Sequence, residues 1–190
     1  QNSFKSLTQE NEFIRPNIEL RNEKTPIDFY GGIKGTLSKR ISFDANFSYA
    51  NIKDKALFVT DTIQSLGNKF NVIYDTMNVA KVEASISYQL KEKIKFDGIG
   101  RYYSYSVLNN SYAWNLPQFQ FILRGTYNLY DKFIFNLDLN LEEGRRALAS
   151  ANDIEATLEN EQRITKLGFL SDLNLGVEYR YNKRISAFVE

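Results

Sequence analysis

Paired acidic side chains are the strongest candidates for chemistry in this sequence, because its 190 residues contain no His and no Cys. Without these residues, the usual serine–histidine, cysteine–histidine and histidine–zinc sites cannot be built. Two carboxylate pairs remain, Asp97 with Asp138 and Glu142 with Glu143. Glycosidase pairs need a defined separation and a substrate cleft, and the sequence indicates neither. We therefore expect a protein that is not an enzyme, with no catalytic residue.

Acidic residues could also bind calcium. No stretch has the spacing of an EF-hand loop, and the absence of Cys removes thiolate metal sites and disulfides. We therefore expect no metal site and no cofactor. The calcium candidates considered are Asp61, Asp75, Asp153, Glu155, Glu159 and Glu161.

Composition excludes further classes of protein. The chain has 24 Lys and Arg against 23 Asp and Glu, whereas a nucleic-acid-binding protein usually carries a basic excess. No run of eighteen apolar residues occurs, so the sequence predicts no transmembrane helix. The 14% aromatic content and the scarcity of Pro favour strands.

One hairpin pattern occurs four times, at residues 37–43, 90–96, 129–135 and 181–187. An apolar residue precedes a short polar turn that ends in Lys or Arg, and an apolar residue then restarts the alternation. This pattern predicts tight β-hairpins. The basic residues of these turns could contact anionic lipid headgroups or a periplasmic partner, but the simpler interpretation is that they are solvated. They are Lys39, Arg40, Lys91, Lys93, Lys132, Lys183 and Arg184.

A largely consistent alternation on both sides of these turns gives each strand one apolar and one polar face. We predict that the polar face lines a lumen. Its charges would either select solutes or form salt bridges that fill the interior. Ile122 and Ile134 are apolar exceptions on this face. The predicted lumen-facing residues are Asp44, Glu83, Asp97, Arg101, Arg124, Asp138, Glu178 and Arg180.

Connections alternate between short turns and long segments, at 53–80, 108–117 and 143–165. Long strands joined in this way are typical of an outer-membrane barrel, whose short turns face the periplasm. Within the third segment, residues 147–163 have helix-like spacing at Ile154 and Leu158, which indicates an ordered exposed loop or a short helix. Residues 70–74 would either extend a strand or form a small loop hairpin.

A soluble sandwich would show the same alternation with its apolar face inside. Long strands, asymmetric connections and recurring Tyr at strand ends favour the membrane instead. We therefore predict an all-β, antiparallel, up-and-down transmembrane barrel with about eight strands visible. Its predicted interfacial aromatics are Tyr49, Tyr88, Tyr102, Trp114, Tyr127, Tyr179 and Tyr181.

The hairpin turns and the segments 66–75 and 112–119 resemble the C-terminal barrel of Bacteroidetes outer-membrane proteins of the TonB-dependent-receptor-like kind. The resemblance covers most of residues 26–190. It implies a barrel segment at 26–190 that is truncated in its last strand, and a polar segment or strand end at 1–25. The sequence contains no plug domain and no TonB box, so a porin-like barrel fits equally well.

We therefore expect a barrel of the bacterial outer membrane that passes or imports solutes. The alternative is an accessory or structural barrel subunit in a larger outer-membrane complex. The expected partners are outer-membrane lipid and other envelope proteins, such as a surface lipoprotein or complex subunits. No nucleic acid is expected.

Overall fold

The computed structural model describes residues 13–15, 20–61, 63–65, 67–149, 157–159, 162–182 and 185–189. Every regular element among them is a strand, and none of the described residues forms a helix suited to crossing a membrane. The strands are β1 (Lys24–Ser38), β2 (Ile41–Thr60), β3 (Phe70–Leu90), β4 (Ile94–Val107), β5 (Phe119–Leu129), β6 (Phe133–Glu143), β7 (Arg146–Leu148), β8 (Thr157–Glu159), β9 (Gln162–Lys166), β10 (Leu170–Asn182) and β11 (Ile185–Val189).

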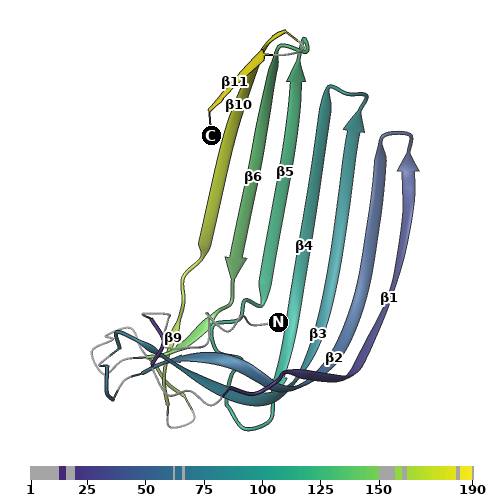
Figure 1. Ribbon diagram of the computed structural model, residues 1–190. Coiled ribbons are helices and arrows are strands. Elements are labelled where there is room, and N and C mark those ends of the chain that lie inside the picture. Colours follow the sequence, from purple (N-terminus) through teal and green to yellow (C-terminus); the bar gives the residue numbers. More distant parts are fainter. Residues whose placement is uncertain are drawn as a thin grey trace.

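Eight strands form one antiparallel sheet in the order β1-β2-β3-β4-β5-β6-β10-β11. The long strands stand side by side, with the short turns at one end and the long connections at the other (Figure 1). We call these the turn end and the loop end. The all-β, up-and-down fold with about eight strands is confirmed, and the sheet is open between β1 and β11.

Three of the four predicted turns lie among the described residues. In the turn from β5 to β6, Tyr130 and Asp131 both have positive φ, at 55° and 57°. The Lys132 amide donates to the Leu129 carbonyl at 3.1 Å. This is the geometry of a type I′ turn, whose twist matches that of the flanking strands. The basic residues Lys183 and Arg184 of the fourth turn lie outside the described residues.

One face of the large sheet is apolar and exposed. Ile33, Ile86 and Leu175 leave 69%, 53% and 60% of their surface uncovered. No described element packs over this face, whereas soluble monomers rarely leave a continuous apolar surface of such size in water. Lipid chains can cover an apolar face of this kind. The backbone N–H and C=O groups are hydrogen-bonded between the paired strands, as a lipid environment requires.

Residues 53–60 and 70–80 belong to strands, in contrast to our prediction of a long connection over 53–80. β2 continues to Thr60 and β3 begins at Phe70, so their hairpin extends well beyond its neighbours. The alternative that residues 70–74 extend a strand is confirmed. A β-bulge between Ile52 and Lys55 adds one residue to β2, and Asp54 has a φ of 53° there. Beyond the bulge, the hairpin bends towards β9 (Figure 1).

The helix considered for residues 147–163 is not found in the described part of that segment. Ala147 and Leu148 belong to β7, and residues 157–159 and 162–163 belong to β8 and β9. These strands form a second, three-stranded sheet in the order β7-β9-β8. Tertiary pairing overrides the local spacing here. Ile154 lies outside the described residues.

Substituting Leu139→Arg on the apolar face of β6 tests the lipid contact. Leu139 pairs with Leu123 and Leu173 on the neighbouring strands. A cation near the bilayer midplane costs about 2–4 kcal/mol. We expect a loss of this size in the urea-induced unfolding of the full-length protein in phospholipid vesicles. The matched Asn140→Arg, one residue along on the polar face, should cost under about 1 kcal/mol. Equal losses would contradict the assignment of the faces.

Candidate functional site

The eight predicted lumen-facing residues all lie on the polar face of the large sheet, as the strand register requires. Glu83 is the centre of one cross-strand group. Its carboxylate accepts a hydrogen bond from Arg101 Nε at 2.6 Å and another from Asn46 Nδ2 at 3.2 Å. Lys81 Nζ lies 3.6 Å from the same carboxylate. Asn46 also donates to Asp44 at 3.1 Å, which extends the group to the β2 carboxylate.

A second group crosses β3 to β6 nearer the turn end. The Ser87 hydroxyl donates to Asp97 at 2.6 Å, and Lys95 pairs with the same carboxylate at 3.2 Å. Arg124 Nε donates to Asp138 at 3.2 Å. On β10, Arg180 Nε donates to Glu178 at 2.9 Å. Each charge predicted to face the lumen therefore has a polar partner on the same face.

This pairing gives no support to the acid–base pairs. Asp97, Arg124 and Asp138 occupy successive strands in register, so the two carboxyl groups lie on strands about 10 Å apart. Arg124 stands between them and bonds Asp138. Glu142 and Glu143 are consecutive in β6, so they project to opposite faces of the sheet.

The predicted interfacial tyrosines lie at two levels on the apolar face. Tyr88, Tyr127, Tyr179 and Tyr181 lie near the turn end, where the Tyr179 ring is 5.0 Å from Phe133. Tyr49 and Tyr102 lie eight residues beyond the first residues of β2 and β4. Eight residues span about 26 Å of strand. At the strand tilt of about 35–45° that such barrels have, this length corresponds to a band about 18–21 Å tall, somewhat less than the typical apolar height of about 25 Å.

Trp114 is not an interfacial anchor, in contrast to our prediction. Only 2% of its surface is exposed, and it packs in a buried cluster with Leu57, Val59 and Ile164. These residues come from β2, from the β4–β5 connection and from β9. Trp114 lies in the connection between β4 and β5 and not in a strand. The alternation of side chains along a strand therefore could not predict its environment. The loop end therefore has its own small hydrophobic core.

We call this folded region the loop cap, comprising residues 55–60, 70–75, 108–118, 146–148 and 164–166. Asn115 ties its parts together, with a φ of 61°. Its side-chain amide donates to the Phe58 carbonyl at 2.7 Å, and its backbone amide donates to the Arg146 carbonyl at 2.8 Å. Leu57 and Val59 face the cap core because the bulge in β2 changes the parity of that strand, and Ile73 of β3 pairs with Leu57 and packs against the same cluster.

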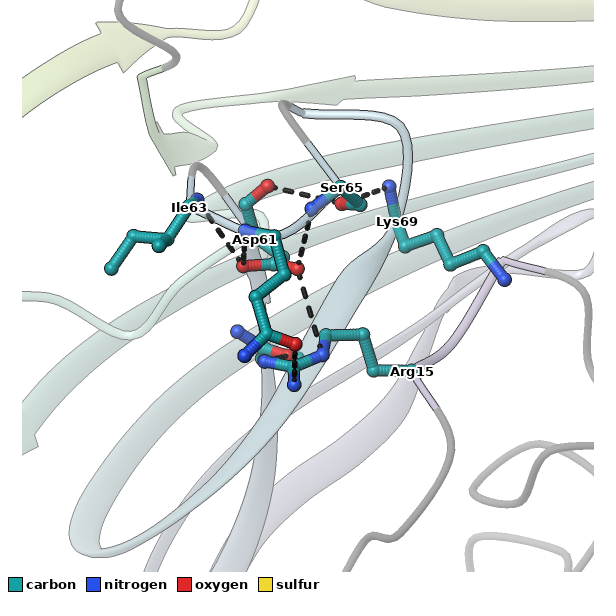
Figure 2. Close-up of polar contacts among 7 residues, drawn as sticks. Arg15, Asp61, Ile63, Ser65 and Lys69 are labelled. Carbon is teal, nitrogen blue, oxygen red and sulfur yellow. Dashed lines mark hydrogen bonds and ion pairs between the residues drawn. The ribbon is translucent and has the colours of Figure 1, made fainter.

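Asp61 closes the tip of the long hairpin (Figure 2). Its carboxylate accepts bonds from the backbone amides of Ile63, Gln64 and Ser65 at 3.0–3.3 Å, and Arg15 Nε lies 3.6 Å away. Burial opposes its charge, but these donors outweigh burial and hold the pKa of Asp61 below the ordinary value. The carboxylate of Asp61, a candidate calcium ligand, is therefore bound by backbone amides and by the Arg15 guanidinium.

Asp75 is the second buried carboxylate of the cap, with 2% of its surface exposed. The backbone and side-chain amides of Asn109 and Asn110 donate to it at 2.7–3.1 Å, and the Thr76 amide donates at 2.7 Å. Burial raises its pKa, yet these donors outweigh burial and lower the pKa overall. Asp75 therefore fastens the β4–β5 connection to β3.

Neither aspartate belongs to a metal-binding cluster, since the described residues contain no group of three or more suitable ligands. The side chains of Asp153, Glu155, Glu159 and Glu161 lie outside the described part of the chain. The candidate calcium sites at Asp61 and Asp75 are thus structural hydrogen-bond centres.

A pocket of about 350 Å³ opens where the polar face meets the loop cap. Tyr105 contributes the strand side, and its ring stacks on Tyr103 at 5.8 Å. Arg146 contributes the cap side, and its guanidinium lies 4.4 Å from the Tyr112 ring. The sequence does not predict this site, because its residues come from β4, a connection and β7. The only signal was the Tyr112 and Trp114 aromatic pair.

Searches against known proteins identify the fold and no closer relationship. No protein-family model matches the chain, and no curated protein matches it. Among solved structures, it matches the pyoverdine outer-membrane receptor FpvA from Pseudomonas aeruginosa with a TM-score of 0.57 and 14% identity. The alignment covers 85% of this chain and 24% of FpvA.

Two other solved structures give the same result. The copper transporter OprC matches with a TM-score of 0.54 and 17% identity, over 85% of this chain and 23% of OprC. The ferric-catecholate import receptor Fiu from Escherichia coli K12 matches with a TM-score of 0.54 and 14% identity, over 96% of this chain and 24% of Fiu. The sheet has the fold of an outer-membrane receptor barrel. This fold supports the predicted location in the bacterial outer membrane.

Substituting Asp75→Asn tests the carboxylate that holds the cap. The new amide places a donor against the Asn109 and Asn110 donors, and an unmatched buried polar group costs about 1–3 kcal/mol. We expect faster hydrogen exchange in residues 108–118 of the full-length protein. The control Asp28→Asn, on exposed β1, should leave exchange unchanged. Unchanged exchange in the Asp75 variant would contradict the role.

Acid should loosen the same region. A carboxyl group with a lowered pKa stabilises the fold above its ordinary value of 3.8, and that stabilisation is lost as the pH falls through the lowered value. We expect hydrogen exchange in residues 61–65 and 108–118, corrected for intrinsic pH dependence, to accelerate below pH 3.8 before the large sheet opens. Simultaneous opening of cap and sheet would contradict this order.

Proposed function

We propose that this chain forms part of the wall of a solute-uptake barrel in the outer membrane, of the TonB-dependent-receptor-like kind. The observation that carries the proposal is the division of one sheet into an uncovered apolar face and a polar face, with a folded cap at one end only. An apolar face towards lipid leaves the polar face to line the solute path, and the cap then stands over the mouth of that path.

The similar structures support a transport role and leave the solute open. Their titles describe a pyoverdine receptor, a copper transporter and a ferric-catecholate import receptor. One fold thus serves several cargoes, and this chain spans about a quarter of the length of each of these structures. Coupling to TonB, rather than porin-like passage, is part of our proposal, as is an origin in Bacteroidetes.

We infer partners and chemistry from the same division of faces. Outer-membrane lipid is the partner of the apolar face, and the loop cap is the surface on which a lipoprotein or another envelope protein would dock. We assign the chain no enzymatic role, because the carboxylates of Glu83, Asp97, Asp138 and Glu178 on the polar face are paired with Arg101, Lys95, Arg124 and Arg180.

Deleting the full-length gene tests the proposal. Across a panel of carbon, nitrogen and metal sources, we expect the deletion strain to lose growth on one nutrient class, because uptake of that class requires this barrel. A strain lacking TonB should lose growth on the same class. The intact gene on a plasmid should restore growth in the deletion strain, and the Leu139→Arg gene, which disturbs the lipid face, should restore less.

The accessory-subunit alternative makes the opposite prediction. Growth of the deletion strain on every source, with stable co-purification of other envelope proteins and no conductance in planar bilayers, would overturn solute uptake. Conductance together with TonB-independent growth would favour a porin-like barrel and overturn TonB coupling.

A further inference from the structure

The pocket at the loop end is lined by a positively charged side chain, Arg146, that has no acidic partner among the described residues. Its guanidinium carbon lies 4.4 Å from the centre of the Tyr112 ring. The guanidinium makes no hydrogen bond or ion pair with the described residues. No Asp or Glu lines the pocket. A guanidinium beside a cavity, with its fork of N–H donors unbonded, is suited to receive an oxyanion.

Arg146 differs in this respect from the arginines of the polar face. Arg101, Arg124 and Arg180 donate to Glu83, Asp138 and Glu178 at 2.6, 3.2 and 2.9 Å. Those pairs neutralise their charges within the sheet. The positive charge of Arg146 is not neutralised by an acidic side chain in this way, so it can interact with a ligand in the pocket.

A second cation reinforces the positive charge beside the pocket. In the β7–β9 ladder, Arg146 lies directly opposite Lys166. Directly opposed like charges destabilise a pair of strands, and no described ion pair involves either residue. A bound anion would remove this repulsion, so the arrangement is more favourable with an oxyanion present than without one.

The remaining lining supplies neutral hydrogen-bonding groups and a ring. Ser111 and Gln118 line the pocket, and their side chains make no hydrogen bond among the described residues. The Tyr105 hydroxyl donates to the Pro117 carbonyl at 2.9 Å, which fixes its ring at the pocket wall. The volume of about 350 Å³ lies at the small end of the range for ligand sites.

We propose that this pocket binds a small solute through an oxyanion group, a carboxylate or a phosphate, held by the Arg146 guanidinium. Ser111 and Gln118 bond the neutral polar part of the solute. Tyr112 holds the guanidinium in place by a cation–π contact. This inference rests on the proposed uptake function and names the class of solute that the barrel receives.

Calorimetric titration of the purified full-length protein tests this site with three probes: succinate, phenyl phosphate and the neutral succinamide. We expect at least one of the two anions to bind and succinamide not to bind. Substituting Arg146→Gln should weaken anion binding about 10- to 100-fold, the range for a hydrogen bond to a charged group. Arg146→Lys keeps the charge but loses the fork, so it should weaken binding less.

The control Arg40→Gln removes an equal charge at the turn end and should leave binding unchanged. Heat-dependent gel mobility checks that every variant is folded. Succinate binding without phenyl phosphate binding assigns a carboxylate, and the converse assigns a phosphate. No saturable binding of either anion, or equal binding by wild type and Arg146→Gln, would overturn the site. Anion binding in a protein whose deletion impairs no uptake would overturn the transport function and leave the site standing.

Discussion

The apolar face of the large sheet needs a nonaqueous environment, and the rest of the structure depends on this requirement. In water, residues such as Ile86 and Leu175 would remain uncovered, and the sheet would lack a core. In a bilayer, the same residues contact lipid while the ladder of strands satisfies the backbone groups. The polar face then has to provide its own partners, which the ion pairs of Glu83 with Arg101 and of Asp138 with Arg124 supply.

The loop end instead buries its apolar side chains in a core, as a soluble protein does. Its apolar side chains form a closed cluster around Trp114, and its buried carboxylates, Asp61 and Asp75, are surrounded by donors. One extra residue in β2, at the bulge near Asp54, connects the two regimes. The change of parity turns Leu57 and Val59 inward at the point where the hairpin leaves the lipid band.

Periodicity was sufficient to predict the membrane part of the chain. A tight turn and strict alternation determine both the register and the face of each residue, so Glu83, Arg101 and Asp138 could be placed before their contacts were known. The cap could not be predicted in this way. A bulge breaks the alternation of β2, and residues 53–60 therefore gave the pattern of a loop although they belong to a strand.

The pocket was missed for a related reason. Arg146 and Tyr112 meet only because Asn115 joins the β4–β5 connection to β7, a contact between distant parts of the chain. No local pattern marks such a contact. Trp114 was misplaced because an aromatic residue near a strand end is common both to a membrane interface and to a small folded loop.

Cysteine scanning of residues 135–142 in β6 tests the division of faces most directly, because these 190 residues contain no Cys and any Cys elsewhere in the protein can be replaced by Ser. Each single-cysteine variant of the full-length protein would be reconstituted in vesicles and labelled with a water-soluble thiol reagent, and then with a fluorophore read against a lipid-borne quencher. The account predicts strict alternation. Labels at Phe135, Leu137, Leu139 and Leu141 should be quenched by lipid, and cysteines at Asn136, Asp138, Asn140 and Glu142 should react from water. Reaction from water at all eight positions, or quenching without a two-residue period, would contradict it.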